Sequence, residues 1–388
     1  MKDLFLLDPE IIFLNHGSFG ATPRPVWEVY QQWQNRLERQ PVKFLGRELI
    51  PELARARQVL GEFLNAPADH LVFISNATFG VNLIARSLDL KPGDEILSTN
   101  HEYGACENVW DFLHSKTGAI LVRQPVPLPL ASPEEVAEQI WAGVNPNTRV
   151  LFLSHITSPT AVHLPVELLC RKARQAGILT FIDGAHAPGQ IPLDLQSLGA
   201  DFYVGNCHKW MLSPKGAGFL YARPEVQPLI EPLVVSWGWG ENASYTTGSR
   251  FLDQLEWWGT KDFSASLSVP AAIRFMREHD WPAVQARCHQ ILEEGIAAIE
   301  QLTGLDSVYA LHAAPFVQLA AARLPHVHDL TAFQAALYDR YRIEVPCIQW
   351  QGLHFIRLSV QAYNRREDIN ALISALADLL PQFADGLP

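Results

Sequence analysis

The residues best suited to chemistry in this sequence are an aspartate and a lysine that each follow a short apolar run. Asp183 comes directly after Leu-Thr-Phe-Ile, and Lys209 comes after Asp-Phe-Tyr-Val-Gly-Asn-Cys-His. A lysine amine can hold an aldehyde as a Schiff base, and a carboxylate can keep a pyridine nitrogen protonated. Pyridoxal phosphate (PLP) needs both groups, because its protonated ring then acts as an electron sink. The pair therefore predicts a PLP-dependent enzyme.

The context of this pair favours a chemical role over a structural one. An isolated aspartate after a strand is usually a turn or helix-cap residue, and an isolated lysine is usually solvated. Here the two residues are 26 positions apart (209 − 183), which is about one strand-connection-strand unit. A Gly-Ala-His turn follows Asp183, and a glycine-rich turn follows Lys209. We therefore expect both side chains to face one pocket from neighbouring strands.

Such a pocket needs a sheet to position it, and the sequence predicts one of the α/β class. Short apolar runs alternate with helix-length segments, a pattern typical of crossover units and a mainly parallel sheet covered on both faces. Ligands of such sheets bind where strands end and helices begin. The predicted strands are Leu71 to Ile74, Glu95 to Ser98, Ala119 to Val122, Val150 to Leu153, Leu179 to Ile182, Phe202 to Val204 and Phe219 to Tyr221.

The pattern changes after a Gly-, Trp-, Ser- and Thr-rich segment at Trp237 to Gly259. A chain of 388 residues exceeds the size of one core, so we expect a large PLP-binding domain at residues 21–260. A smaller α+β domain would combine residues 1–20 with residues 261–388. Its predicted helices are Ala265 to Glu278, Trp281 to Leu302, Leu330 to Tyr341 and Arg366 to Leu380, and its predicted strands are Phe316 to Ala320, Ile343 to Cys347 and His354 to Ser359.

Charge and cysteine content narrow the classes of partner. The net charge is 30 − 41 = −11, and an acidic surface repels phosphate backbones, so we expect no nucleic acid partner. Five widely spaced cysteines without a C-x-x-C pair argue against a disulfide framework or a metal site. The first residues lack a basic region and a cleavage site, and no apolar run approaches the ~20 residues of a membrane span. The sequence therefore predicts a cytoplasmic protein with no membrane partner.

One segment is suited to bind the phosphate of the cofactor. Asn76-Ala77-Thr78 lies between an apolar run and the helical pattern Val-Asn-Leu-Ile-Ala-Arg-Ser-Leu. A helix N-terminus offers backbone N–H groups and a favourable dipole to a dianion, and the Thr78 hydroxyl adds a donor. The same residues also suit an ordinary helix cap, so both interpretations stay open.

Several motifs, in order along nearly the whole chain, resemble one family. They are similar to the class V aminotransferase-type PLP enzymes of fold type I, a group that includes cysteine desulfurases. Within that group the similarity is greatest to the isopenicillin N epimerase-like proteins. The resemblance implies the fold more strongly than the substrate. The motifs are LNHGSFG from Leu14, ISNATFGVN from Ile74, HEYGA from His101, SHITSPTA from Ser154, DGAHAPG from Asp183, GNCHKW from Gly205, WWGTKD from Trp257 and IRLSVQAYN from Ile356.

The resemblance implies roles for the residues around the ring of the cofactor. Lys209 would form the Schiff base, and Asp183 would contact the ring nitrogen. Tyr103 would stack on the ring face where desulfurases use a histidine, although an ordinary half-buried tyrosine is the alternative. His186 would contact the phenolic oxygen. Ser158 stands where desulfurases have an asparagine near that oxygen, and there the epimerase-like proteins are closer.

The resemblance also implies which residues contact the phosphate and the substrate. Asn206 and His208 match side chains that reach the phosphate. Arg357 matches an arginine that binds the substrate carboxylate, to which its planar fork is suited; a solvated strand-end arginine is the alternative. The segment Asn15 to Gly20, with Asn15 and His16 as contacts, resembles one that closes over the substrate. Thr260 matches a threonine that the second subunit supplies, which implies a homodimer.

The desulfurase mechanism is disfavoured, because it uses a cysteine on a mobile loop shortly before the arginine. Here the preceding cysteine is Cys347, in the apolar run Ile-Glu-Val-Pro-Cys-Ile-Gln-Trp, where a thiol is usually buried and inert. If Lys209 removes the α-proton, the outcome depends on a second group. Proton return from the opposite face, where Tyr103 would lie, gives epimerisation, and loss of a β-substituent gives elimination.

Three hypotheses follow for an amino acid substrate. The first is an epimerase-like enzyme, and the second is a carbon-sulfur lyase acting on cysteine, cystine or cysteine sulfoxide derivatives. The third is a catalytically silent binding protein with the same fold, against which the presence of Lys209, Asp183 and Arg357 argues. The sequence leaves epimerisation, elimination and transamination open.

Overall fold

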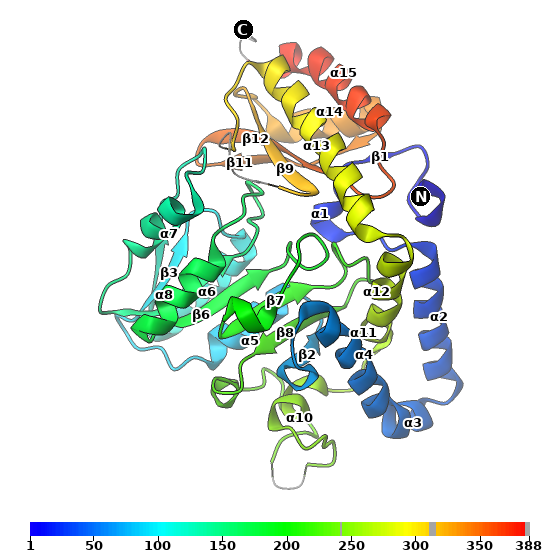
Figure 1. Cartoon of the computed structure of the whole chain (residues 1–388), viewed down its shortest axis with the longest axis vertical. Helices are drawn as coiled ribbons and strands as arrows, with labels where there is room; N and C mark the ends of the chain where they lie inside the picture. The colour runs from blue at the N-terminus through cyan, green and yellow to red at the C-terminus, as the bar shows by residue number, and fades with distance from the viewer. Residues whose placement is uncertain (241–242, 310–315, 385–388) are drawn as a thin grey trace.

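A computed structural model describes residues 1–240, 243–309 and 316–384 and is built around a seven-stranded sheet. The strand order is β2-β8-β7-β6-β5-β3-β4; β8 is antiparallel to both neighbours, and the remaining pairs are parallel (Figure 1). The predicted α/β fold with a mainly parallel sheet is therefore confirmed. The strands are β2 (Leu71–Ile74), β3 (Glu95–Thr99), β4 (Ile120–Gln124), β5 (Thr148–Ser154), β6 (Leu179–Gly184), β7 (Phe202–Asn206) and β8 (Gly218–Ala222).

Successive residues of each strand enter different cores, as the period of two requires. Leu71 and Phe73 pack into one core, which includes helices α4, α7, α8, α9 and α12. Val72 and Ile74 pack into the other core, which includes α5, α6 and α10. These helices cover the two faces of the sheet. The helices of this part are α2 (Arg24–Arg39), α3 (Pro41–Lys43), α4 (Leu49–Leu64), α5 (Ala77–Ser87), α6 (Gly104–Thr117), α7 (Pro133–Trp141), α8 (Val166–Ala176), α9 (Leu195–Leu198), α10 (Arg250–Glu256), α11 (Ser264–Leu267) and α12 (Val269–Glu278).

The topology of this sheet sets the position of a ligand site. Strand β3 lies between β4 and β5, and from β5 the chain builds the sheet in the opposite direction. Ligands of open α/β sheets bind at such a reversal, outside the carboxyl ends of the strands. The residues that follow β3 and those that end β5 and β6 are therefore expected to meet in one crevice.

Two smaller sheets lie at the other end of the molecule. Strand β12 pairs antiparallel with both β11 and β9, while β1 pairs with β10 in parallel (Figure 1). The long helix α13 packs against β9 and α15, and α14 packs against α15. The elements are α1 (His16–Phe19), β1 (Ile12–Phe13), α13 (Trp281–Thr303), β9 (Leu319–Leu324), α14 (Leu330–Tyr341), β10 (Ile343–Glu344), β11 (Cys347–Trp350), β12 (Leu353–Ser359) and α15 (Arg366–Phe383).

Two of the predicted strands in this part differ from the observed ones. The run predicted at Phe316 to Ala320 becomes a strand only at Leu319, because pairing with β12 involves Leu319 to Leu324. The run predicted at Ile343 to Cys347 is divided between β10 and β11, with Pro346 between them. Proline has no N–H to donate to a ladder, so it interrupts the strand there.

The amino-terminal residues belong spatially with the carboxyl-terminal ones. Besides the β1–β10 pair, Asn15 forms a bridge with Ser359, and Leu14 exchanges backbone hydrogen bonds with β10 and β12. Helices α11 and α12 pack instead against α2 and α4. The domain division at residues 260 and 261 stays a prediction.

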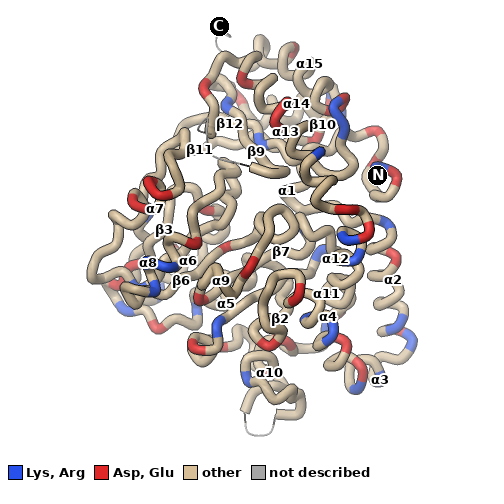
Figure 2. The backbone as a smooth tube through the Cα atoms, viewed as in Figure 1, with Lys and Arg blue, Asp and Glu red and all other residues tan. Residues whose placement is uncertain are grey.

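Charged residues of both signs are interspersed over the chain (Figure 2). Among the described residues, no helix combines the length and apolar character that crossing a membrane requires.

Candidate active site

A cavity of about 340 Å³ lies at the carboxyl edge of the large sheet. Its walls come from the ends of β5, β6 and β7, the N-termini of α5 and α6, the loop between β7 and β8, and α1. The structure thus brings most of the predicted site residues together. Those that line the cavity are Asn76, Ala77, Thr78, Tyr103, Ser158, Asp183, His186, Asn206, His208 and Lys209.

Asp183, in β6, is buried beside this cavity. Its Oδ1 accepts a hydrogen bond from the Ala185 N–H at 2.9 Å, and its Oδ2 accepts a weak one from the Cys106 thiol at 3.4 Å. Burial raises the pKa of the Asp183 carboxyl, and the hydrogen bonds from Ala185 and Cys106 and the charge of Lys209 offset this only in part. A protonated ring nitrogen would add a further cation beside the buried carboxylate, so the carboxylate fits the group that PLP presents.

A second buried carboxylate, Glu102, is not among the site residues predicted from the sequence. Its Oε1 accepts from the Thr99 hydroxyl at 2.7 Å, and its Oε2 accepts from the Ser154 N–H at 2.8 Å and hydroxyl at 2.6 Å. Burial raises the pKa of Glu102 to about 7, and the nearby charge of Asp183 acts in the same direction. Glu102 joins the end of β3 to the end of β5 beneath the cavity. Its position directly before the predicted site residue Tyr103 is the sequence feature that could have pointed to it.

Lys209 lies on the loop between β7 and β8, and its amine faces His186. The Nζ atom is 3.2 Å from His186 Nε2. Burial lowers the pKa of Lys209 to about 7, the charge of Arg357 adds to that effect, and Asp183 and Cys106 oppose it. A large fraction of the amine is therefore neutral near pH 7, and a neutral amine can act as a nucleophile or a base.

The N-terminus of α5 is a capped helix end and also faces the cavity, so it fits both interpretations that the sequence left open, a helix cap and a phosphate site. Asn76 is the N-cap residue, since its Oδ1 accepts from the Phe79 N–H at 2.8 Å. Asn206 Oδ1 accepts from the Ala77 N–H at 2.8 Å and fixes this helix end to β7. Thr78 lines the cavity, so the helix end also faces the space where a phosphate would lie.

His208 is a neutral ring at this edge of the cavity. Its Nδ1 is 3.1 Å from the Ala217 carbonyl, to which it donates, and burial lowers its pKa to about 4. Its Nε2 is then an acceptor. A phosphate dianion would raise this pKa and turn Nε2 into a donor, so the predicted phosphate contact depends on the anion itself.

Arg357 reaches the site from β12. Its Nη1 donates to the Ser158 carbonyl and, at 3.1 Å, to the Ser158 hydroxyl, and its Nη2 donates to the Ser18 hydroxyl at 3.2 Å. Its buried Nε has no hydrogen-bond partner among the described residues. Burial lowers the pKa of Arg357 to about 10, so the group remains cationic at pH 7. A buried cation held beside lining residues is suited to bind a carboxylate.

Tyr103 is an accessible aromatic residue at the edge of the site. It precedes α6, lines the cavity and is 46% exposed. Its ring is therefore available to a ligand, unlike that of a core tyrosine.

Besides Arg357, which contacts the lining residues Ser18 and Ser158, three predicted residues lie outside the cavity lining. His16 is fully buried, and its ring nitrogens are 3.0 Å from the Tyr363 hydroxyl and 3.1 Å from the Lys209 carbonyl. Burial lowers its pKa to about 3, so His16 holds the Lys209 backbone as a neutral ring instead of facing a substrate. Asn15 donates to Glu344 at 3.0 Å. Thr260 is exposed outside the cavity of its own chain.

The segment Asn15 to Gly20 still contributes to the site through other residues. Ser18 and Phe19 line the cavity, and Phe19 is 72% exposed. A Cβ atom on Gly20 would lie 1.9 Å from the His208 carbonyl oxygen, and the residue has a φ of +70°. Glycine is therefore required where this segment crosses the Lys209 loop.

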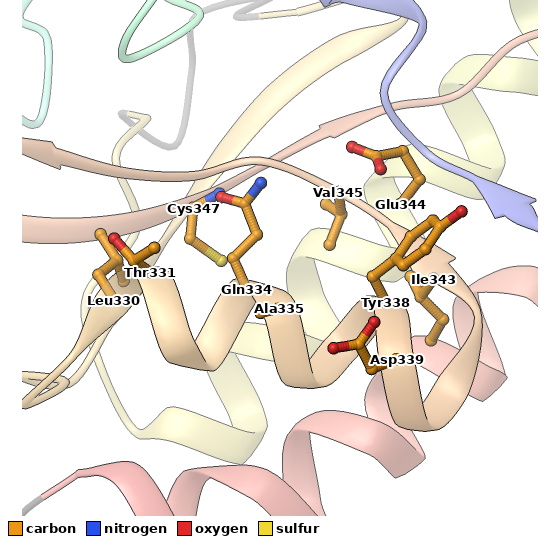
Figure 3. Close-up of a pocket in the computed structure, with 10 residues that line it drawn as sticks. All are labelled: Leu330, Thr331, Gln334, Ala335, Tyr338, Asp339, Ile343, Glu344, Val345 and Cys347. Carbon is orange, nitrogen blue, oxygen red and sulfur yellow. The ribbon is translucent and has the colours of Figure 1, made fainter.

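Cys347 lies in a different groove, between α14 and strands β10 and β11 (Figure 3). Its N–H donates to Gln334 Oε1 at 3.0 Å, and burial raises the pKa of its thiol to about 12. A thiol in this position is protonated at pH 7. Among the described residues that line the candidate site, none is a cysteine.

Comparisons with known proteins agree with this geometry. A family model described as aminotransferase class-V matches residues 21–372. Isopenicillin N epimerase of Amycolatopsis lactamdurans is 37% identical over 384 residues, which cover 96% of each chain. A probable chloroplastic L-cysteine desulfhydrase of Arabidopsis thaliana is 26% identical and covers 96% of this chain and 84% of its own. The solved structure of the cystine C-S lyase C-DES with cysteine persulfide shares the fold, with a TM-score of 0.83 at 23% identity over 97% of this chain and 98% of that one.

Proposed function

The chain belongs to the class V aminotransferase family of PLP-dependent enzymes, and we propose that it acts at the α-carbon of an amino acid or amino-acid-like substrate as an epimerase of the isopenicillin N epimerase type. The bound cofactor supplies an electron sink for negative charge at that carbon. The remaining chemistry is assigned to the chain's own side chains.

Lys209 would hold the cofactor, and its free amine would serve as the base that removes the α-proton. Its pKa of about 7 makes the neutral amine available, and a base is most efficient when its pKa lies near the working pH. Asp183 holds the proton of the ring nitrogen. Arg357, together with Ser18 and Ser158, orients the substrate carboxylate.

The observation that carries the epimerase proposal is that Lys209 and Tyr103 both line the same cavity. A change of configuration needs one group to remove the proton and another to return it from the opposite face. Tyr103 has a hydroxyl that can donate, and its exposure of 46% leaves it accessible. Tyr103 is therefore assigned as the second proton-transfer residue.

A carbon-sulfur lyase is the second candidate, favoured by the desulfhydrase name of the Arabidopsis relative. Elimination from a cysteine derivative needs Lys209 and a leaving group but no second acid. Replacing Tyr103 would then leave turnover largely intact, so the two candidates differ in what Tyr103 does.

We further propose that the active unit is a homodimer in which Thr260 contacts the partner's cofactor. Thr260 is exposed, which fits a residue with a partner outside its own chain. Apolar side chains are exposed in the preceding segment, including Val235 at 63%, Trp237 at 66% and Trp239 at 55%. Exposed apolar groups so close together are typical of an interface.

The test is incubation of the purified protein in deuterated water with L-amino acids, cystine and cysteine sulfoxides. Deuterium at the α-carbon with loss of optical purity and no pyruvate supports the epimerase. Pyruvate with sulfur release establishes the lyase instead. The Lys209→Ala variant is the control and should lack both the visible cofactor band and either activity; turnover in that variant would contradict the proposal.

A further inference from the structure

The ring of His186 lies between an indole and an amine, and its two nitrogens have different partners. Trp210 Nε1 donates to His186 Nδ1 at 3.3 Å. His186 Nε2 is 3.2 Å from Lys209 Nζ. Trp210 directly follows Lys209 and is fully buried. His186 therefore connects Trp210, the residue after Lys209, to the amine of Lys209.

These contacts determine where the proton of His186 resides. An indole N–H is only a donor, so His186 Nδ1 must accept and carries no hydrogen. Burial lowers the pKa of His186 well below 6.5, and the charges of Lys209 and Arg357 lower it further. A neutral ring with a bare Nδ1 has its single hydrogen on Nε2, which faces Lys209.

We propose that Trp210 is a positioning residue that fixes His186 as the Nε2–H tautomer and thereby makes it a hydrogen-bond donor toward the reactive centre. The His186 Nε2–H favours the neutral form of the Lys209 amine, because the lone pair of a neutral amine can accept this hydrogen bond. An ammonium group can only donate and is therefore disfavoured. Toward the cofactor, where the inference rests on the proposed function, the same N–H suits the phenolic oxygen.

The surroundings hold both rings in this arrangement. Trp210 packs in a small cluster with Ile156, Ala187 and Leu319. A Cβ atom on Gly189 would lie 2.5 Å from the Trp210 carbonyl oxygen, so the backbone there is tightly packed. The His186 carbonyl accepts from Gln190 Nε2 at 2.7 Å. These contacts fix the Trp210 ring in a packed cluster and hold the backbone of both residues in place.

The charged groups around the pair come from other elements. Lys209 faces Arg357 from β12, Asp183 from β6 and Cys106 from α6, and His186 faces Lys209 and Arg357. A Trp210→Phe change removes one indole N–H and leaves all of these groups in place. A shift in the apparent pKa of the visible cofactor band would then report the tautomer of His186.

The experiment compares Trp210→Phe with Trp110→Phe in the holoenzyme. Trp110 is an equally buried indole in α6, and its N–H has no hydrogen-bond partner among the described residues, so the control loses the same atoms without the contact. We expect the apparent pKa of the visible cofactor band to rise by roughly one unit in Trp210→Phe, the scale of one hydrogen bond to a charged group, and to stay unchanged in Trp110→Phe. Equal behaviour of the two variants would overturn the proposal.

Neutron diffraction of the full wild-type chain as purified tests the tautomer directly and needs no variant to fold. Deuterium on His186 Nε2 with none on Nδ1 is the expected result, and deuterium on Nδ1 would refute the assignment. A chain that shows the expected tautomer but no visible cofactor band would count against the proposed function alone, so the two failures are distinguishable.

Discussion

At Lys209, the burial that prepares the amine for chemistry also weakens the fold. Its pKa is lowered from 10.5 to about 7, so between these values the unfolded chain binds more protons than the folded one. Stability then rises with pH through this window, and the cost of burying the amine is complete below about pH 7. The functional lysine thus destabilises the protein without cofactor under ordinary conditions.

Replacing this amine with an apolar group of similar length should stabilise the cofactor-free protein. We expect Lys209→Met to raise the free energy of unfolding by about 2 kcal/mol at about pH 6, with a smaller gain at about pH 9.5, where the wild-type amine costs little. Urea unfolding at both pH values measures the difference. A gain independent of pH would show that packing, and not the charge, is responsible.

Residues with a direct chemical role were easier to predict from the sequence than those that support them. Asp183 and Lys209 follow apolar runs, and both line the cavity. Glu102 and Trp210 were missed, because their importance depends on which side chains the fold brings beside them. His16 was placed in the right segment, but no sequence pattern distinguishes a ring that faces a ligand from one that holds the Lys209 backbone.

At the scale of elements, the contact between β8 and the start of α5 sets the phosphate end of the site. A Cβ atom on Gly218 would lie 2.9 Å from Asn76 Cα and 2.9 Å from the Gly205 carbonyl oxygen. Both neighbours are backbone atoms, which cannot rotate away. The first turn of α5 can approach the sheet this closely only because residue 218 is a glycine.

Gly218→Ala should therefore push the N-terminus of α5 outward and weaken cofactor binding. We expect the dissociation constant for PLP to rise about tenfold, which corresponds to about 1.4 kcal/mol, as measured by fluorescence titration of the cofactor-free protein. Gly46→Ala is the matched control, since its Cβ would meet no atom within 4 Å. Similar losses in both variants would mean that the effect is not specific to this contact.

Cys347 lines the groove between α14 and strands β10 and β11 and does not line the candidate active site. Cys347→Ser should keep the turnover number within about twofold of wild type, because the side chain lies away from the cofactor cavity and its environment is tolerant of a small change. Steady-state kinetics with the substrate that the assay in deuterated water identifies provide the measurement. A loss of tenfold or more would reopen the persulfide route.

The elements themselves were largely predictable, and their junctions were not. All strands of the large sheet were predicted within a few residues, because each is a short apolar run in a regular crossover pattern. The antiparallel orientation of β8 and the division of one run at Pro346 were not predicted. Orientation depends on the connection that precedes a strand, and the effect of one proline depends on the register of its partner.

At the scale of the whole molecule, the proposed homodimer makes a quantitative prediction. Lys209→Ala subunits should be inactive alone and Thr260→Ala subunits only weakly active, but a mixed dimer contains one site with both wild-type residues. Random mixing should recover about a quarter of wild-type activity, because half of the dimers are mixed and each has one intact site of two. Activity measured after subunit exchange checks this, and no recovery would place Thr260 outside the partner's site.

The pairing of β1 with β10 has a consequence for how the chain is made. Ile12 is in register with Ile343, so strand β1 has no partner until the chain has been synthesised as far as β10. The central sheet can assemble earlier from its own consecutive units, whereas contacts so distant in sequence form late. His16, which holds the Lys209 backbone, follows this strand directly. We therefore expect the lysine loop to be fixed in place late in folding, when the rest of the site already surrounds the amine.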